Sequence, residues 1–451
     1  MWPCPPRRGP LLLVWLLTDD RPLDAAPKMI TIRLGFAGPF IDWSDIMFGI
    51  NDDSLASIEF RLAWEKNGIR HTDAVHAERV NFWRDLFPES MRRDLMGSFP
   101  GDRVARAFAP GELVPLPDEG HRYAVPHRRV EGQLSDGTPI VPRYGRFYPR
   151  GILRGVPGVF PENIQPFRCT DADAAGIRAD FNHPLAGRDL QIEARVLDVR
   201  EKFEEHGGTA NDWIEHSFAG PGMQARCNGD ATRFFDGPAL ERDDDSDDRR
   251  FYEAPRLVQH IDARAVATIR DLYGRLISPG SRVLDLMSSW TSHLPRDLVT
   301  EAVTGLGMNA EELARNERLQ AFDVHDLNRR PRLPYPDAAF DAVICTVSVE
   351  YLTQAPAVFA DVARVLVPGG LFAVTFSDRW FPTKAIRVWK ELHPFERMGL
   401  VLELFHQTER FSALETFSSQ GWPRPEDDKY ADQLAYSDPV FAVWGRRRPA
   451  V

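Results

Sequence analysis

The stretch RVLDLMSSW, residues 282–290, decides how the second half of the chain folds. Its first five residues form a short apolar run with Asp285 near its end, and the turn Met287–Trp290 follows at once. In a sheet of parallel strands, ligands lie outside the carboxyl ends of the strands. A turn at that place also offers backbone N–H groups. The stretch therefore predicts a ligand site beside a buried strand.

On both sides of this stretch, helical periodicity alternates with short apolar runs from Phe251 onward. Short buried strands that alternate with helices indicate a parallel sheet with helices on both faces. The sequence therefore predicts a doubly wound α/β domain over residues 251–451. The expected helices are 263–276, 311–317 and 356–366, and the expected strands are 283–286, 342–346, 371–376 and 439–444.

Further motifs follow the first strand in a fixed order. They are Asp326-Leu327, LPYPD at 333–337, FDAV at 340–343 and RVLVPGG at 364–370. This set resembles the class I methyltransferases, in particular the type 11 group. The resemblance implies a Rossmann-like fold and S-adenosylmethionine as the cofactor.

The resemblance also implies roles for individual residues. Asp285 and the turn would lie against the methionine part of the cofactor, whereas Asp326 would bind the adenine amino group beside Leu327. The cofactor-binding residues expected in this way are Asp285, Met287, Ser288, Ser289, Asn309, Asp326 and Leu327.

Two departures from the family pattern concern the cofactor. The family usually has glycines where this chain has Met287, Ser289 and Thr291, and Met287 is not expected to adopt the backbone conformations of glycine. Gly307 stands where most members carry an acid that holds both ribose hydroxyls, so Asn309 and Glu311 are candidates to replace it. The departures indicate either a subgroup with an adjusted pocket or weakened cofactor binding.

The segment before the first helix adds two candidates. Tyr252 and Arg256 either contact the cofactor's carboxylate or cap and pack the helix. No residue is clearly a general base, which the reaction needs only if the acceptor must lose a proton. Four further side chains near predicted strand ends either face the acceptor or are structural: His293, Glu350, Trp380 and Lys384.

The first half of the chain contains a second motif. Asn182–Gly187 reads NHPLAG and precedes the alternating strand 191–199. This arrangement resembles the SlyD-type FKBP prolyl isomerases, and it implies a mainly β domain over 29–203 with an inserted flap at about 120–180. The implied isomerase pocket consists of Asp73, Phe87, Val114 and Ile192. Because Val114 and Ile192 replace aromatic residues, the site would be shallow, so the domain is either an isomerase or a peptide-binding module.

The remaining segments are expected to lie outside the two domains. Residues 1–28 contain Arg7-Arg8 and the apolar run 11–17, which fits a dispensable extension or a short signal peptide. Residues 204–250 carry paired glycines and the acidic run 243–248, which predicts a solvated linker.

Composition narrows the function classes. A net charge of −11 argues against a nucleic-acid partner, and no apolar run is long enough to span a membrane. Four dispersed cysteines favour neither a metal site nor a disulfide framework and fit a cytoplasmic protein. The sequence thus predicts methyl transfer to an unknown acceptor, with a polypeptide as one candidate. The alternative is a non-catalytic, chaperone-like scaffold.

Overall fold

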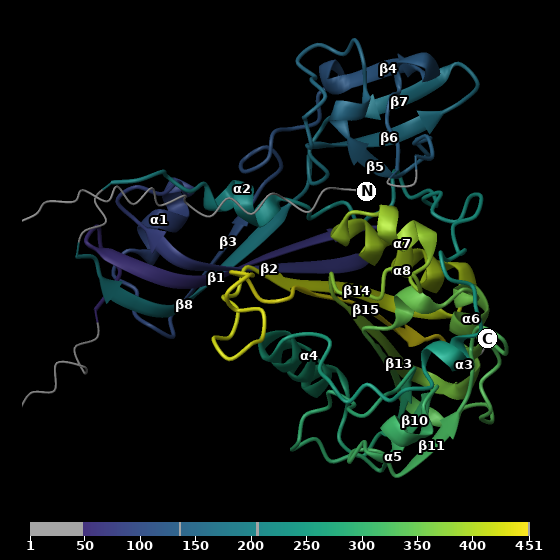
Figure 1. Cartoon of the computed structure of the whole chain (residues 1–451). Helices are drawn as coiled ribbons and strands as arrows, with labels where there is room; N and C mark the ends of the chain where they lie inside the picture. Colours follow the sequence, from purple (N-terminus) through teal and green to yellow (C-terminus); the bar gives the residue numbers. More distant parts are fainter. Residues whose placement is uncertain (1–47, 135–136, 204–206, 450–451) are drawn as a thin grey trace, which may run out of the picture. The chain divides into compact units, whose positions relative to one another are not determined.

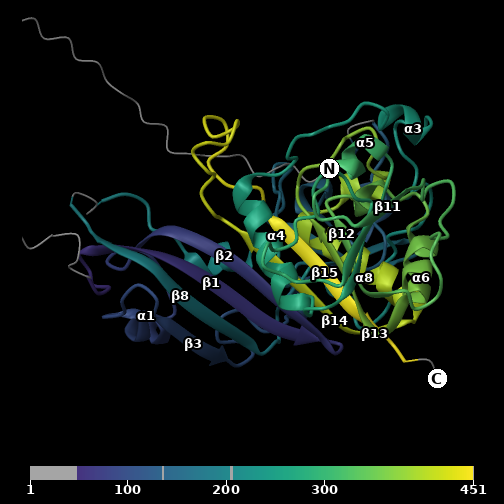
Figure 2. The ribbon, with the colours of Figure 1, turned by 90° about the horizontal axis from the view of Figure 1, so that it is seen from below.

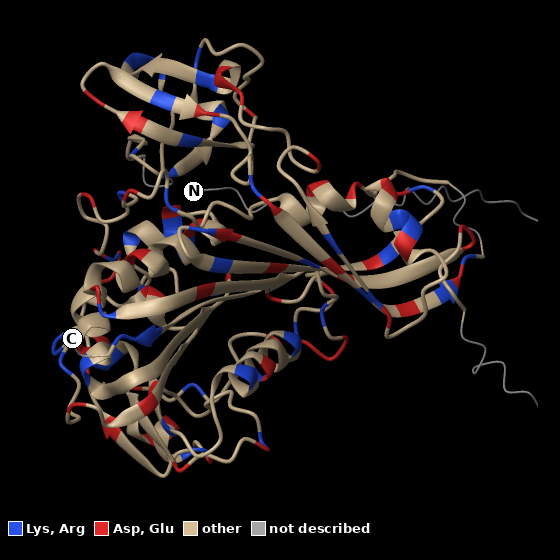
Figure 3. Cartoon of the chain, turned by 180° about the vertical axis from the view of Figure 1, so that it is seen from behind, with Lys and Arg blue, Asp and Glu red and all other residues tan. Residues whose placement is uncertain are grey.

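The computed structural model describes residues 48–134, 137–203 and 207–449. The expected extension 1–28 and the first residues of the expected 29–203 domain lie outside the described residues. In the part that is described, no helix is both long and apolar enough to cross a membrane. Basic and acidic residues are interspersed along the elements rather than gathered on one of them (Figure 3).

The second half of the chain forms the predicted α/β layer structure. Strands β9, β10, β11, β12 and β13 pair in parallel, whereas β15 runs antiparallel between β13 and β14. The strand order is β11-β10-β9-β12-β13-β15-β14. The bounds are β9 (Arg282–Leu286), β10 (Ala302–Gly307), β11 (Ala321–Val324), β12 (Phe340–Thr346), β13 (Leu366–Phe376), β14 (Phe411–Gln420) and β15 (Val440–Arg447).

Helices cover both faces of this sheet because its strands are apolar on both sides. Val283 packs in the cluster under α4 (Ala263–Leu276), while Leu284 packs in the opposite cluster with α6 (Ala355–Val365) and α8 (Pro394–Thr408). Figures 1 and 2 show α4 on one side of the sheet and α6 and α8 on the other. Shorter elements are α3 (Asp248–Phe251), α5 (Ala310–Ala314), α7 (Arg387–Glu391) and the 3-10 turn η5 (Val349–Tyr351).

The first half of the chain is mainly β, as predicted. A long hairpin, β1 (Ser54–Lys66) and β2 (Ile69–Asn81), turns at Asn67-Gly68, where both residues have the positive φ of a tight hairpin turn. β8 (Leu190–Glu201) pairs with β1, and a separate four-stranded sheet lies within the range predicted as a flap. The remaining elements are α1 (Glu89–Leu95), β3 (Arg103–Phe108), β4 (Arg122–Pro126), β5 (Phe147–Pro149), β6 (Pro166–Ala172), β7 (Gly176–Asp180) and α2 (Trp213–Phe218).

The two halves share one sheet. β2 pairs in parallel with β14, from Arg70 opposite Glu415 to Val75 opposite Gln420, so that eleven strands are continuous. Side chains reinforce this seam: the Nδ1 atom of His71 lies 2.7 Å from the hydroxyl oxygen of Thr416. The sequence did not predict this union, because the strand that joins the halves follows β2 by more than three hundred residues.

The prediction of a solvated linker over 204–250 is wrong for much of that segment. Met223 and Phe234 are buried in the core cluster that contains α8. In the acidic run, Asp248 is 5% exposed and accepts two 2.9 Å hydrogen bonds from Arg242. Lys384, itself buried, forms a second ion pair with Asp248 at 3.1 Å. Paired in this way, the carboxylate can be buried without the full cost of an isolated charge.

The predicted isomerase pocket is not an open site. Val114 and Ile192 are 5% and 2% exposed and belong to one packed core, against which Phe87 lies partly buried. Asp73 is enclosed at the seam, where it accepts hydrogen bonds from Trp64 Nε1 at 3.0 Å and Ser418 Oγ at 2.8 Å. Its carboxylate therefore forms hydrogen bonds where the two halves of the chain meet, and it is not available to bind a substrate peptide.

Asp73 makes the stability of the protein depend on pH. Burial raises its pKa from 3.8 to about 6, because hydrogen bonds from Trp64, Ser418 and Gln224 offset only part of the desolvation. The protonated carboxyl is favoured in the folded state, so its stabilising contribution is complete below pH 4 and is lost as the pH rises through 6. Asp73→Asn should remove this component, up to about 3 kcal/mol between pH 4 and 7.

Urea denaturation of the wild type and the variant across pH 4–7 measures this difference. An unchanged difference between the two proteins over this range would show that Asp73 does not titrate there. Asp102→Asn, at an exposed aspartate, is the control.

Candidate functional site

One pocket lies where β9, β10 and β12 end, at the carboxyl edge of the parallel strands. It is lined by all nine residues predicted to hold a cofactor, which come from four separate stretches of sequence. These residues are Tyr252, Arg256, Asp285, Met287, Ser288, Ser289, Asn309, Asp326 and Leu327. The structure thus brings the predicted residues together, which motif order alone could not establish.

The turn after β9 is built around Asp285. This carboxylate is 3% exposed and accepts hydrogen bonds from the hydroxyls of Ser288 and Ser292, both at 2.6 Å. Burial raises its pKa to about 6, although the two hydroxyls lower it. Met287 has a φ of 58°, so the expectation that it would not adopt a glycine-like conformation is wrong. The side chain accepts a left-handed backbone that costs about 1–2 kcal/mol for a non-glycine residue.

The two departures from the family pattern have one physical cause. The Ser288 N–H donates to the Leu306 carbonyl at 2.8 Å, which brings the β9 turn against the end of β10. A Cβ atom on Gly307 would then lie 2.2 Å from the Ser288 carbonyl oxygen. An acidic residue cannot occupy position 307 while the turn keeps this path, because the carbonyl fills the space of its side chain.

A different acid, Glu312, lies in the pocket. Glu312 is 8% exposed and lines the pocket, where it accepts hydrogen bonds from Ser289 Oγ and the Arg256 N–H, both at 2.6 Å. The suggestion that Glu311 replaces the missing acid is wrong: it is exposed and forms an ion pair with Arg315 at 2.6 Å. Asn309 caps α5, accepting from the N–H groups of residues 311 and 312. This cap determines that Glu312, rather than Glu311, turns towards the pocket. The capping residue Asn309 was visible in the sequence.

The opposite end of the pocket follows β11. Asp326 Oδ1 accepts hydrogen bonds from the backbone N–H groups of Asn328 at 3.0 Å and Arg329 at 3.2 Å. Partial burial raises the pKa of Asp326. Leu327 beside it is 4% exposed and belongs to the main core. An acceptor next to an apolar wall suits a flat heterocycle with an amino group.

A strap formed by residues 248–260 borders the pocket. The Arg256 guanidinium lies 4.4 Å from the ring centre of Phe251 and 5.4 Å from that of Phe381, and it donates to the Phe251 carbonyl at 2.8 Å. Its Nη1 atom is buried and has no hydrogen-bond partner among the described residues. Asp248, in the same strap, is held by Arg242, Lys384 and Asn328. The strap is thus anchored while one arginine nitrogen is left for a ligand.

The four other candidates are two buried titratable residues, His293 and Glu350, and two structural residues, Lys384 and Trp380. His293 lines the pocket, and burial lowers its pKa to about 4, so the ring is neutral. Glu350 is 1% exposed, burial raises its pKa to about 7, and its Oε2 atom has no partner among the described residues. Lys384 and Trp380 are structural: the lysine is ion-paired with Asp244 and Asp248, and the indole packs under the Arg397 guanidinium at 4.3 Å.

The close approach at Gly307 predicts an unusual cost for the smallest substitution. Gly307→Ala should lower the free energy of unfolding by about 1–3 kcal/mol, since a backbone carbonyl cannot rotate away as a side chain can. Gly207→Ala is the control, because a Cβ atom there meets nothing within 4 Å. Urea denaturation measures both. Equal stability of the two variants would mean that the turn is free to move from β10.

Comparison with known proteins agrees with this geometry. Residues 288–374 match a family model described as a methyltransferase domain. The chain is 27% identical over 204 residues to the sterol 24-C-methyltransferase of Gibberella zeae, covering 38% of this chain and 52% of that protein. It is 40% identical over 65 residues to the ubiquinone/menaquinone biosynthesis C-methyltransferase of Chromobacterium violaceum, covering 14% and 23%. The chain spans about half or less of the length of these curated relatives.

Among solved structures, the chain is similar to an S-adenosylmethionine-dependent methyltransferase from Mesorhizobium loti. The identity is 16% and the TM-score is 0.27, over 39% of this chain and 96% of that one. The family match and the curated relatives carry the assignment. The chain contains a class I methyltransferase domain, an enzyme domain whose cofactor is S-adenosylmethionine.

Proposed function

We propose that this chain transfers a methyl group from S-adenosylmethionine to a small, largely apolar acceptor, at a carbon atom. The observation that carries the proposal is the convergence of nine motif residues on one pocket at the carboxyl ends of the strands. The curated relatives support the kind of acceptor, because both are named as C-methyltransferases, one of a sterol and one of quinone biosynthesis.

The residues present fit the cofactor. The buried, unpartnered Nη1 atom of Arg256 suits a carboxylate, and Glu312 supplies a carboxylate acceptor for ribose hydroxyls on the same side of the pocket as Gly307. Asp326 and Leu327 would hold the adenine ring at the other end. When bound, the cofactor supplies an electrophilic methyl group on its sulfonium. The protein's part is to position the acceptor in line with that group and to exclude water.

The acceptor would enter beside η5 and the segment after β13. Val347, Tyr351 and Phe381 give that part of the pocket an apolar wall. Glu350 adjoins Tyr351 in the chain but is buried and is not one of the residues that line the pocket.

Adjacent glutamates allow a matched test of cofactor binding. Glu312→Gln should weaken S-adenosylmethionine binding about tenfold, which corresponds to about 1.4 kcal/mol, because a charged acceptor becomes neutral. Glu311→Gln, one residue away but exposed, should bind as the wild type does. Isothermal titration calorimetry of the full chain measures both. Equal affinity of the two variants would show that Glu312 does not contact the cofactor.

Methyl transfer is tested with methyl-labelled S-adenosylmethionine and three candidate acceptors: a sterol, a demethylated quinone and an unfolded polypeptide. Label in a lipid product is the expected result. Label in the polypeptide would contradict an apolar small-molecule acceptor. Cofactor binding without label in any fraction would favour the non-catalytic scaffold.

We propose polypeptide binding as a second function, in residues 48–203. The predicted resemblance to FKBP prolyl isomerases supports this function. Exposed large apolar side chains support it as well: Trp83, Leu86 and Phe203 are 55%, 56% and 80% exposed. Binding fits better than isomerisation, because Asp73, Val114 and Ile192 are buried.

The full chain should therefore have little activity in an X–Pro peptide isomerase assay and should slow the aggregation of an unfolded client. Phe203→Ser should reduce that protection severalfold, whereas Val299→Ser, at a similarly exposed apolar residue of the other half, should not. Rapid isomerisation of the peptide would contradict the burial of Asp73, Val114 and Ile192.

A further inference from the structure

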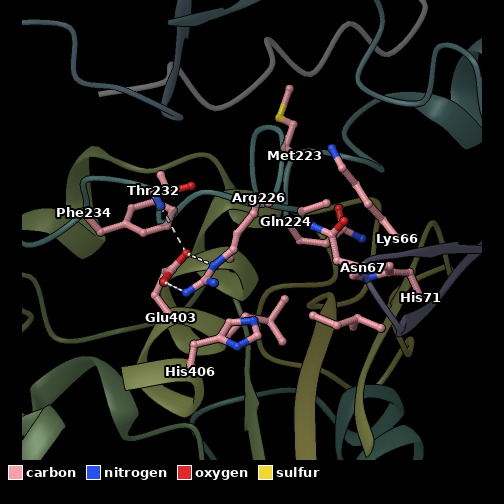
Figure 4. Close-up of a pocket in the computed structure, with 15 residues that line it drawn as sticks. Lys66, Asn67, His71, Met223, Gln224, Arg226, Thr232, Phe234, Glu403 and His406 are labelled. Atoms are coloured by element: carbon pink, nitrogen blue, oxygen red, sulfur yellow. Dashed lines mark hydrogen bonds and ion pairs between the residues drawn. The ribbon is translucent and has the colours of Figure 1, made fainter. Parts of the chain in front are cut away.

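A second cavity lies away from the cofactor pocket. It encloses about 190 Å³ between the β1–β2 hairpin, the segment 223–234 and α8 (Figure 4). That volume is well above the roughly 30 Å³ that one water molecule occupies in the liquid. Part of the wall is apolar and part carries nitrogen atoms. The apolar side chains are Ile69, Met223, Phe234 and Leu402, and the nitrogen-bearing ones are Lys66, Asn67, His71, Gln224, Arg226 and His406.

The cavity's carboxylate is already neutralised. Glu403 accepts two hydrogen bonds from Arg226, at 2.7 and 2.6 Å, and one from the Thr232 N–H at 3.1 Å, as Figure 4 shows. The paired geometry of this ion pair leaves neither partner free to balance another charge. Glu403 is therefore not available to neutralise a further positive charge on the cavity wall.

Lys66 provides that further charge. No carboxylate lies within 4 Å of its Nζ atom among the described residues, and neither Arg168 nor Arg188 nearby has an ion pair there. Arg168 donates to the backbone carbonyls of Gly145 and Ala225 instead. None of these three cations thus has a carboxylate within 4 Å among the described residues, and the partly buried Lys66 amine is left to attract an anion.

A buried nitrogen without a partner lines the same cavity. The Nδ1 atom of His71 lies 2.7 Å from Thr416 Oγ1, but its Nε2 atom is buried and has no partner among the described residues. Burial lowers the pKa of His71 to about 3, so the ring is neutral and offers Nε2 as a single polar contact. Buried polar atoms of this kind are normally satisfied by protein, water or ligand.

We propose that this cavity is a second ligand site, which binds a small organic molecule carrying a carboxylate or phosphate group on an apolar body. The anionic group would pair with Lys66, and the body would lie against the apolar wall. The site is independent of methyl transfer, because no residue of its wall lines the cofactor pocket.

The pH dependence follows from the groups around Lys66. Burial, followed by the charges of Arg168 and Arg188, lowers the pKa of Lys66 to about 8. An anion stabilises the protonated amine, so its affinity should be constant below pH 8 and fall above it. The other titratable or charged groups that face Lys66 from neighbouring elements are His71, Arg226, Cys227, Glu403 and His406.

Benzoate, phenyl phosphate and the neutral isostere benzamide are suitable probes for the full chain. Benzoate or phenyl phosphate should raise the melting temperature at millimolar concentration, and benzamide should not. Preference between the two anions identifies the head group. Equal effects of benzoate and benzamide, or no effect of any probe, would overturn the proposal.

Lys66→Met tests the contact directly. The variant should lose at least tenfold in anion affinity while melting no lower than the wild type without ligand, because an unpaired cation is removed. A merely structural lysine would instead lower the melting temperature. Arg70→Met, at an exposed residue of the same hairpin, is the control and should keep the wild-type affinity. Unchanged binding by Lys66→Met, or by the wild type between pH 7 and 9.5, would equally overturn the proposal.

Discussion

The parallel pairing of β2 with β14 is the constraint on which the rest of the structure depends. It gives the methyltransferase sheet a neighbour where β14 would otherwise present unpaired N–H and C=O groups. It also encloses Asp73 among Trp64, Gln224 and Ser418, which come from both halves of the chain. The second cavity exists because the hairpin that carries Lys66 is held beside α8 by this pairing.

The cofactor pocket shows how a departure from a family pattern can be internally consistent. Met287 adopts a left-handed backbone, the Ser288 carbonyl then reaches the end of β10, and only glycine fits at position 307. From the sequence, these changes indicated either a subgroup with an adjusted pocket or weakened cofactor binding. In the structure they belong to one turn that lies against the end of β10, and Glu312 is an acid that lines the same pocket.

The sequence predicted the α/β layers from local periodicity, and the nine pocket residues came from the motifs that resemble class I methyltransferases. The family resemblance implied residues such as Asp285 and Asp326, and the structure places them at the carboxyl edge of the parallel strands. Sequence reasoning failed where a contact joins distant segments: nothing local indicates that Asp73 faces Ser418, or that Asp248 meets Lys384. The choice between Glu311 and Glu312 depended on one helix cap, Asn309, and was accessible in principle.

The pairing of β2 with β14 can form only late in synthesis of the chain. His71 and Thr416 are 345 residues apart, so β2 leaves the ribosome long before its partner strand exists. At about 5–20 residues per second, the interval is roughly 20–70 s. During that time the outer edge of the hairpin is open to any other extended chain, and Asp73 faces water. A nascent chain of this protein is therefore exposed to mispairing for most of its synthesis, and factors that cover strand edges on the ribosome would increase its yield.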